Sequence, residues 1–197
     1  MSPEKSKRGK IFIVSSPSGC GKTTIIREII RRLGSQYKLN VVITYTSRQP
    51  RPGEINGQDY FFVSRQEFEQ KKQDNFFLET TEFNNNLYGS PAHILEELRT
   101  GQSFIFVIEQ EGAQSLLKKI KNPVLIWIAP PSIQALKERI LKRNSETPEN
   151  IENRLKIAER EIAFAQNSHI FNYTIVNDAL EMAIQEVARI ITSSIQH

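Results

Sequence analysis

The segment that most constrains this chain is the loop that follows its first apolar run, Ile11–Val14. The loop reads Ser15-Ser-Pro-Ser-Gly-Cys-Gly-Lys-Thr23 and leads into a helix-like stretch. A glycine-containing loop that joins a buried strand to a helix and ends in Gly-Lys-Thr is the pattern that cradles phosphate groups. Its backbone N–H groups and the helix N-terminus attract the anion, Lys22 adds a cation, and Thr23 adds a hydroxyl ligand for Mg²⁺.

The loop departs from the usual G-x-x-x-x-G-K-[ST] pattern at one position, because Ser16 replaces the first glycine. Gly19 and Gly21 remain, and they allow the backbone to turn inward around phosphate oxygens. The alternative is an ordinary turn with Lys22 on the surface. Cys20 has no neighbouring general base, so we expect it to be a spectator rather than a nucleophile.

Further apolar runs predict a parallel sheet that is buried on both faces. They are short and continuous, unlike the alternating pattern of a half-exposed strand. The five runs are Ile11–Val14, Val41–Ile43, Phe104–Ile108, Val124–Ile128 and Tyr173–Val176. Helix-like segments alternate with them, at about 22–33, 111–120, 132–143, 148–166 and 179–195. This alternation is typical of an α/β fold, with the chemistry at the carboxyl ends of the strands.

Two segments interrupt the alternation. Residues 44–90 carry turn signals, clustered aromatic residues and only short helical stretches, which predicts a small mixed β insertion. Residues 132–168 are helical and rich in Arg, Lys and Glu, which is typical of a lid over an anionic site or of a plain surface helix pair. The core would then comprise residues 1–43, 91–131 and 169–197.

The composition limits where the chain acts and on what. Its apolar runs are far shorter than the ~20 residues of a membrane helix, so we expect no membrane partner. One cysteine, Cys20, suits a reducing cytoplasm, where we expect the protein to be. The net charge of +4 is compatible with nucleic acid and with polyanionic nucleotides alike. No nucleic-acid-recognition motif accompanies the charge, so we expect no nucleic-acid partner.

The predicted insertion carries a second phosphate-binding pattern. Arg48 and Arg51 lie three residues apart on a loop constrained by proline and glycine, and Tyr60 follows nine residues later. Guanidinium groups make forked contacts with phosphate oxygens, and the tyrosine hydroxyl adds another donor. We therefore predict that this loop also binds a phosphate group.

The two phosphate-binding motifs, together with Phe77-Leu-Glu79, Leu87-Tyr-Gly-Ser90 and Ala129-Pro-Pro-Ser132, resemble guanylate kinase over nearly the whole chain. Guanylate kinases are P-loop nucleoside monophosphate kinases with a five-stranded parallel sheet, a GMP-binding insertion and a helical lid. The resemblance implies Mg²⁺-dependent transfer of the γ-phosphoryl group of ATP to GMP or dGMP, which gives GDP and ADP in purine nucleotide metabolism. It leaves open whether the protein is a monomer or a homodimer.

The resemblance also implies roles for individual residues. The GMP-binding residues would be Thr44, Arg48, Arg51, Tyr60, Glu79, Tyr88, Ser90 and Glu109. The ATP-binding residues would be Ser16, Pro17, Ser18, Gly19, Cys20, Gly21, Lys22, Thr23, Thr24, Arg139, Arg143 and Asn177, with Thr23 as the metal ligand. The catalytic residues would be Lys22, Arg48, Arg139, Arg143 and Arg154. Asn177 could equally cap the final helix.

The chemistry of Glu79 supports a guanine site independently. Guanine presents N1–H and N2–H₂ as adjacent donors, which one carboxylate can accept together. Adenine has an unprotonated N1 at that place, so it would repel the carboxylate and leave a buried acceptor without a partner. The alternative for Glu79 is an ordinary surface charge at the end of a strand.

The predicted lid carries three arginines. Arg139 and Arg143 lie four residues apart on one predicted helix face, and Arg154 falls on the next predicted helix. By the resemblance, they would close over ATP and stabilise the charge that spreads over the transferring group. Asn144 stands where these enzymes usually have glycine, and asparagine tolerates the left-handed backbone of such a turn. Each arginine could instead be a solvated helix charge.

One strand end departs from the resemblance. Guanylate kinases usually have two acidic residues there, two positions apart, and this chain has Val107 and Glu109. Alternation along a strand would put both side chains on one face, with Glu109 nearer the ligand end. We predict that Glu109 contacts GMP or a magnesium-bound water, and that Mg²⁺ relies mainly on substrate phosphates, water and Thr23.

Three other functions share parts of these features. A guanylate-kinase-like module that has lost catalysis and binds partner peptides would keep the fold, but such modules usually have a degraded phosphate loop. Lys22 and Thr23 favour an enzyme instead. Glu79 and Tyr88 argue against a ribose bisphosphate as the acceptor. A nucleic-acid-binding protein would have only the net charge to support it.

Overall fold

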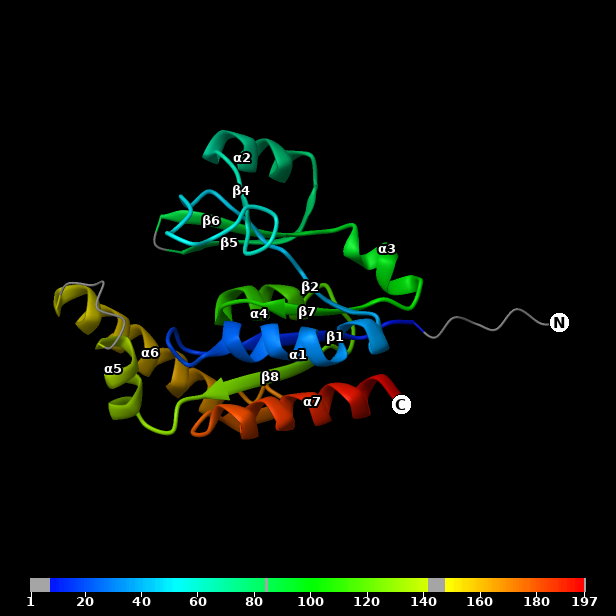
Figure 1. The fold of residues 1–197 in the computed structure, drawn as a ribbon. Coiled ribbons are helices and arrows are strands. Elements are labelled where there is room, and N and C mark those ends of the chain that lie inside the picture. Colours follow the sequence, from blue (N-terminus) through cyan, green and yellow to red (C-terminus); the bar gives the residue numbers. More distant parts are fainter. Residues whose placement is uncertain (1–7, 84, 142–147, 197) are drawn as a thin grey trace.

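The computed structural model describes residues 8–83, 85–141 and 148–196, and its centre is a five-stranded parallel sheet (Figure 1). The strands are β1 (Ile11–Ser15), β2 (Leu39–Val41), β7 (Ser103–Val107), β8 (Val124–Ala129) and β9 (Tyr173–Val176). Their order is β2-β7-β1-β8-β9, and all neighbours are parallel. The predicted α/β class and parallel sheet are therefore confirmed. The second strand ends at Val41, two residues before the predicted end, because the chain leaves the sheet there to enter the insertion.

Helices cover both faces of this sheet. They are α1 (Lys22–Tyr37), α3 (Ile94–Arg99), α4 (Gln110–Leu117), α5 (Ile133–Leu141), α6 (Pro148–Ser168) and α7 (Leu180–Gln196). Phe12 and Val14 of β1 pack in one hydrophobic cluster with residues of α1, α5 and α7. Ile11 and Ile13 pack in a second cluster with residues of α3 and α4. Successive side chains of the strand thus enter opposite cores, which explains why the apolar runs are continuous.

The predicted mixed β insertion is also confirmed. It contains β3 (Tyr45–Thr46), β4 (Phe61–Phe62), β5 (Phe77–Phe83) and β6 (Asn86–Pro91) in the order β4-β3-β6-β5. The β3–β4 pair is parallel and the other pairs are antiparallel.

Helix α2 (Arg65–Gln73) packs on the mixed sheet through Phe68, which is fully buried and stacks on Phe77 with 4.5 Å between ring centroids. Gly89 of β6 leaves room for both rings, since a Cβ there would lie 2.9 Å from each of them. The insertion thus has an aromatic core of its own.

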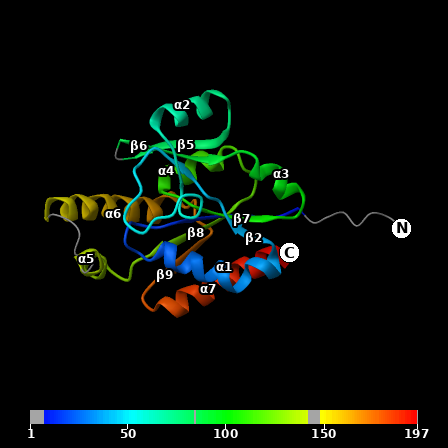
Figure 2. The ribbon, with the colours of Figure 1, turned by 45° about the horizontal axis from the view of Figure 1, so that its top comes forward.

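The two sheets form separate layers. In Figure 1 the mixed sheet and α2 lie beyond α4, and α5 and α6 lie at the end toward which the arrow of β8 points. Figure 2 shows the same arrangement from another side. The carboxyl ends of the parallel strands therefore lie toward the insertion and toward α5 and α6, the helices of the predicted lid. None of the described helices combines the length and apolar composition that crossing a membrane requires.

Replacing Phe68 with alanine should lower the free energy of unfolding by about 3–5 kcal/mol, because it leaves a cavity between α2 and the mixed sheet. Urea denaturation monitored by circular dichroism measures the change. Phe68→Leu keeps most of the volume and should lose less than half as much. A loss below about 1 kcal/mol for the alanine variant would contradict the packing described here.

Candidate active site

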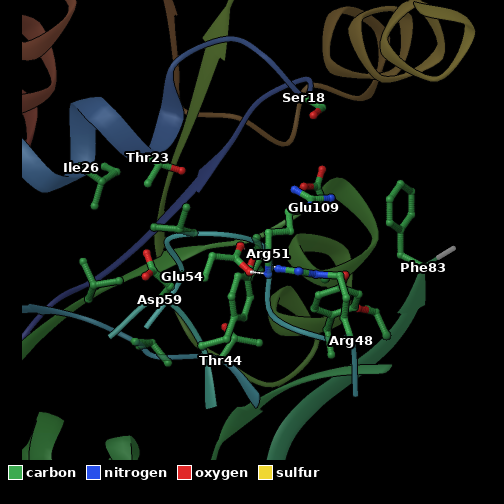
Figure 3. Close-up of a pocket in the computed structure, with 18 of the residues that line it drawn as sticks. Ser18, Thr23, Ile26, Thr44, Arg48, Arg51, Glu54, Asp59, Phe83 and Glu109 are labelled. Atoms are coloured by element: carbon green, nitrogen blue, oxygen red, sulfur yellow. Dashed lines mark hydrogen bonds and ion pairs between the residues drawn. The ribbon is translucent and has the colours of Figure 1, made fainter. Parts of the chain in front are cut away.

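A cavity of about 380 Å³ lies between the parallel sheet and the mixed sheet. Nine of the predicted site residues line it, namely Ser18, Thr23, Thr44, Arg48, Arg51, Tyr60, Glu79, Tyr88 and Glu109. Figure 3 shows Ser18 and Thr23 on the side of the loop and α1, and Arg48 and Arg51 on the side of the insertion. The fold thus brings the two predicted phosphate-binding motifs to one cavity.

The phosphate loop has the backbone that its glycines allow. Gly19 and Gly21 have φ values of 98° and 82°, in the left-handed region that favours glycine. Gly21 caps α1, whose first residue is Lys22. A Cβ on Gly21 would also lie only 2.8 Å from Nδ2 of Asn177, so this position needs glycine for two reasons.

Asn177, which directly follows β9, holds this loop in place through hydrogen bonds. Its side-chain Nδ2 donates to the backbone carbonyl of Cys20 at 2.8 Å. Its backbone carbonyl accepts from Nη2 of Arg139 at 2.9 Å. These bonds fix the loop to the end of β9 and to α5. Burial raises the pKa of the Cys20 thiol to about 12, although the charges of Arg139 and Lys22 lower it. The thiol is therefore neutral at physiological pH, as a spectator should be.

Lys22 of the phosphate loop pairs with Glu109, which lines the cavity. Nζ of Lys22 lies 3.6 Å from Oε1 of Glu109. Strand β7 ends at Val107, and Glu109 caps α4 in the turn that follows. Val107, Ile108 and Glu109 all line the cavity, so the alternation of a strand does not continue to Glu109. The strand ends one residue before its predicted end at Ile108, and Glu109 lies in the turn that follows.

Arg48 is held in place by a residue that the sequence analysis did not single out. Its Nη2 lies 2.8 Å from Oε1 of Glu54, and its guanidinium carbon lies 5.4 Å from the ring centroid of Tyr60. Oε2 of Glu54 accepts from the backbone N–H of Arg51 at 2.7 Å. One carboxylate thus holds the side chain of Arg48 and the backbone of Arg51 in this loop. The regular spacing Arg48-x-x-Arg51-x-x-Glu54 was the signal available in the sequence.

Glu79 is the buried carboxylate of the site. It is 3% exposed, and its Oε1 accepts from Oγ of Ser90 at 2.7 Å, across the β5–β6 pair. Its Oε2 is buried and has no hydrogen-bond partner. Burial raises the pKa of Glu79 to about 7, although hydrogen bonds from Ser90 and the charge of Lys119 lower it. Gly112 of α4 leaves space beside Oε2. A Cβ at this position would lie 3.7 Å from that oxygen, in van der Waals contact with it.

Helices α5 and α6, which fall in the predicted lid, contact the phosphate loop. Nη2 of Arg154 on α6 donates to Oγ of Ser18 at 2.7 Å, and Arg139 on α5 reaches the loop through Asn177. Arg143 lies outside the described residues. Among the other predicted ATP-site residues, Ser16 and Pro17 lie in the phosphate loop, and Thr24 lies in the first turn of α1.

Some residues that line the cavity were not predicted from the sequence. Asp59 of the insertion accepts from Arg27 of α1 at 2.6 Å and joins the two layers. Ile157 and Glu161 of α6 also line the cavity. These residues lie far apart in the sequence and share no motif, so no local pattern could have revealed them.

The donor groups present fit a magnesium ion that takes most of its ligands elsewhere. The Thr23 hydroxyl and the Glu109 carboxylate are hard oxygen groups on one cavity. Within residues 8–83, 85–141 and 148–196, no group of three or more acidic, His or Cys side chains could hold a metal unaided. Mg²⁺ commonly keeps several waters and binds substrate phosphates, so two protein oxygen groups are compatible with such an ion.

The fold and the cavity define a P-loop protein whose phosphate loop faces a second, arginine-lined site. A family model described as guanylate kinase matches residues 8–194. A guanylate kinase of Thermus thermophilus is 38% identical, over 96% of this chain and 82% of its own length. That of Rubrobacter xylanophilus is 40% identical, over 93% and 94%. The crystal structure of guanylate kinase from Anaplasma phagocytophilum has a TM-score of 0.80 at 27% identity, covering 98% of this chain and 89% of its own. The chain belongs to the guanylate kinase family.

Glu79→Gln should make stability less dependent on pH. The folded protein raises the pKa of Glu79 from 4.5 to about 7, so it binds a proton that the unfolded chain has already lost. The resulting stability is complete below pH 4.5 and is lost as the pH rises through 7. The free energy of unfolding of the wild type, from urea denaturation, should therefore fall more between about pH 5 and 8 than that of the variant.

The control for this comparison is Glu82→Gln, which changes an exposed carboxylate on the same strand. It should follow the wild type at each pH. If Glu79→Gln also follows the wild type, the carboxyl group of Glu79 is not buried in the way described.

Proposed function

We propose that this protein is an active guanylate kinase, which transfers the γ-phosphoryl group of ATP to GMP or dGMP. The observation that carries the proposal is the half-satisfied carboxylate of Glu79, buried in the same cavity that the phosphate loop enters. Guanine offers this carboxylate two adjacent N–H donors, whereas adenine has an acceptor, N1, at the same place. The family's named relatives and the intact phosphate loop favour an enzyme over a module that only binds partners.

On the donor side, the loop and α1 would hold ATP. Backbone N–H groups around Gly19 and Gly21 and the N-terminus of α1 attract the phosphates. Lys22 would exchange Glu109 for the β- and γ-phosphates. Arg154 already contacts the loop at Ser18, so it would lie close to the transferring group. We propose the same role for Arg139 and for Arg143, with Asn177 supporting the loop.

On the acceptor side, Arg48 and Arg51 would bind the GMP phosphate, together with the hydroxyl groups of Tyr60 and Tyr88. The ion pair between Arg48 and Glu54 fixes the guanidinium before substrate arrives, which reduces the entropy lost on binding. The base would lie against Thr44 and Glu79, which line the cavity, with Ser90 holding the Glu79 carboxylate, and Glu109 would contact GMP from the side of the phosphate loop.

Magnesium bound at Thr23 would neutralise negative charge on the ATP phosphates. The reaction needs no general base, because the attacking phosphate oxygen of GMP is already anionic at neutral pH. The residues of this chain therefore act by placing donor and acceptor in line and by holding positive charge around the transferring group.

We assign each proposed role to a separate part of the chain. Residues 44–90 would be the GMP-binding insertion and residues 132–168 the lid. Residues 1–43, 91–131 and 169–197 would be the P-loop core. We place the reaction in the cytoplasm, in purine nucleotide metabolism, without a nucleic-acid or membrane partner.

A coupled ADP-release assay with ATP and Mg²⁺ should show turnover with GMP and dGMP. With AMP or UMP, kcat/KM should be at least about a thousandfold lower, because neither base satisfies the buried carboxylate. Lys22→Ala, which removes the cation of the phosphate loop, serves as the control for contaminating kinases. A folded wild-type protein that does not turn over GMP would contradict the proposal and favour the non-catalytic module.

A further inference from the structure

Helix α4 lies against β5, the strand that carries Glu79. The two elements are in contact, and in Figure 1 β5 lies directly above α4. Gly112, in the first turn of α4, lies beside Oε2 of Glu79. Past the end of the helix, the backbone N–H of Lys119 donates to the carbonyl of Leu116 at 2.9 Å and so extends α4 by a tight turn. Gly112 and Lys119 are about two helical turns apart and therefore lie on the same side of this segment.

Strand β5 has a bulge directly before Glu79. The two neighbours of Leu78 in β5 pair with consecutive residues of β6, Pro91 and Ser90, so Leu78 is an extra residue in this pair of strands. The extra residue of a bulge has no regular partner across the ladder. Nζ of Lys119 donates to the backbone carbonyl of Leu78 at 2.6 Å. A positively charged donor makes such a hydrogen bond short and strong.

Leu78 is thus held to the core in two ways. Its side chain is 6% exposed and packs in the second hydrophobic cluster, which includes Ala113 and Leu116 of α4. Its carbonyl is held by Lys119. This carbonyl belongs to the peptide group that joins Leu78 to Glu79, and a peptide group is planar. The direction of the carbonyl therefore sets the orientation of the backbone from which the Glu79 side chain projects.

We propose that Lys119 is a positioning residue for guanine recognition, which fixes the peptide group before Glu79 and so holds the Glu79 carboxylate at the cavity. The inference rests on the proposed function. Ser90, which bonds Oε1 of Glu79, belongs to the same mixed sheet, so its bond fixes the carboxylate only relative to the insertion. The bond from Lys119 fixes the strand relative to α4 and the parallel sheet.

The charge of Lys119 acts in the same direction. Burial raises the pKa of Glu79, whereas the positive charge of Lys119 lowers it. Lys119 therefore favours the ionised carboxylate, which can accept both N–H donors of guanine. It does so without entering the base site, because its ammonium group is bonded to the backbone of β5.

The test measures the affinity for GMP and IMP by titration calorimetry. Lys119→Met removes the ammonium group and keeps a chain of similar length. It should weaken GMP binding by about tenfold and lower the preference for GMP over IMP by about threefold, with ATP affinity unchanged. Lys119→Arg keeps a charged donor and should recover most of the loss. In a Glu79→Gln background, Lys119→Met should add little further loss, because the carboxylate that Lys119 positions is already absent.

Lys118→Met is the matched control, since Lys118 is the preceding residue and is exposed. It should bind both nucleotides as the wild type does, and thermal melting checks that each variant is folded. A folded Lys119→Met variant with wild-type affinity for GMP would overturn the inference. So would equal losses for GMP and IMP, because Lys119 would then support the insertion as a whole rather than Glu79. A wild-type protein that binds no GMP would instead overturn the proposed function.

Discussion

The carboxylate of Glu79 destabilises the ligand-free protein, and the site is built around it. A buried acceptor without a partner costs about 1–3 kcal/mol or more when it is charged. Ser90 satisfies one oxygen, and the space kept by Gly112 leaves the other open. A ligand with adjacent N–H donors would remove this cost. The same feature that lowers the stability of the empty protein therefore selects the base.

Three cations of the site are also held by neighbouring groups in the ligand-free protein. Lys22 pairs with Glu109, Arg48 pairs with Glu54, and Arg154 bonds a hydroxyl of the phosphate loop. Each is held near the place where a phosphate is expected, so little conformational entropy remains to be lost on binding. Of these three contacts, the Lys22 pair is the one that joins the phosphate loop to a predicted acceptor residue. Binding of ATP would exchange this pair for contacts between Lys22 and the phosphates.

Much of the fold and of the candidate site could be predicted from the sequence, because the relevant sequence patterns are local. The phosphate loop is one contiguous segment, and continuous apolar runs indicated a sheet with two covered faces. The resemblance to guanylate kinase located Glu79. Local patterns could not show that Asp59 of the insertion contacts Arg27 of α1, because this contact depends on how distant elements pack. The position of Glu109 in a turn was also hidden, since a strand end is poorly defined by periodicity.

The central claim is that Glu79 recognises the N1–H and N2–H₂ groups of guanine together. Titration calorimetry with GMP and IMP tests it most directly, because hypoxanthine keeps N1–H and lacks only the 2-amino group. The account predicts that GMP binds at least about tenfold more tightly than IMP, since IMP offers the buried carboxylate one N–H donor group where GMP offers two. Equal affinities for the two nucleotides would contradict it.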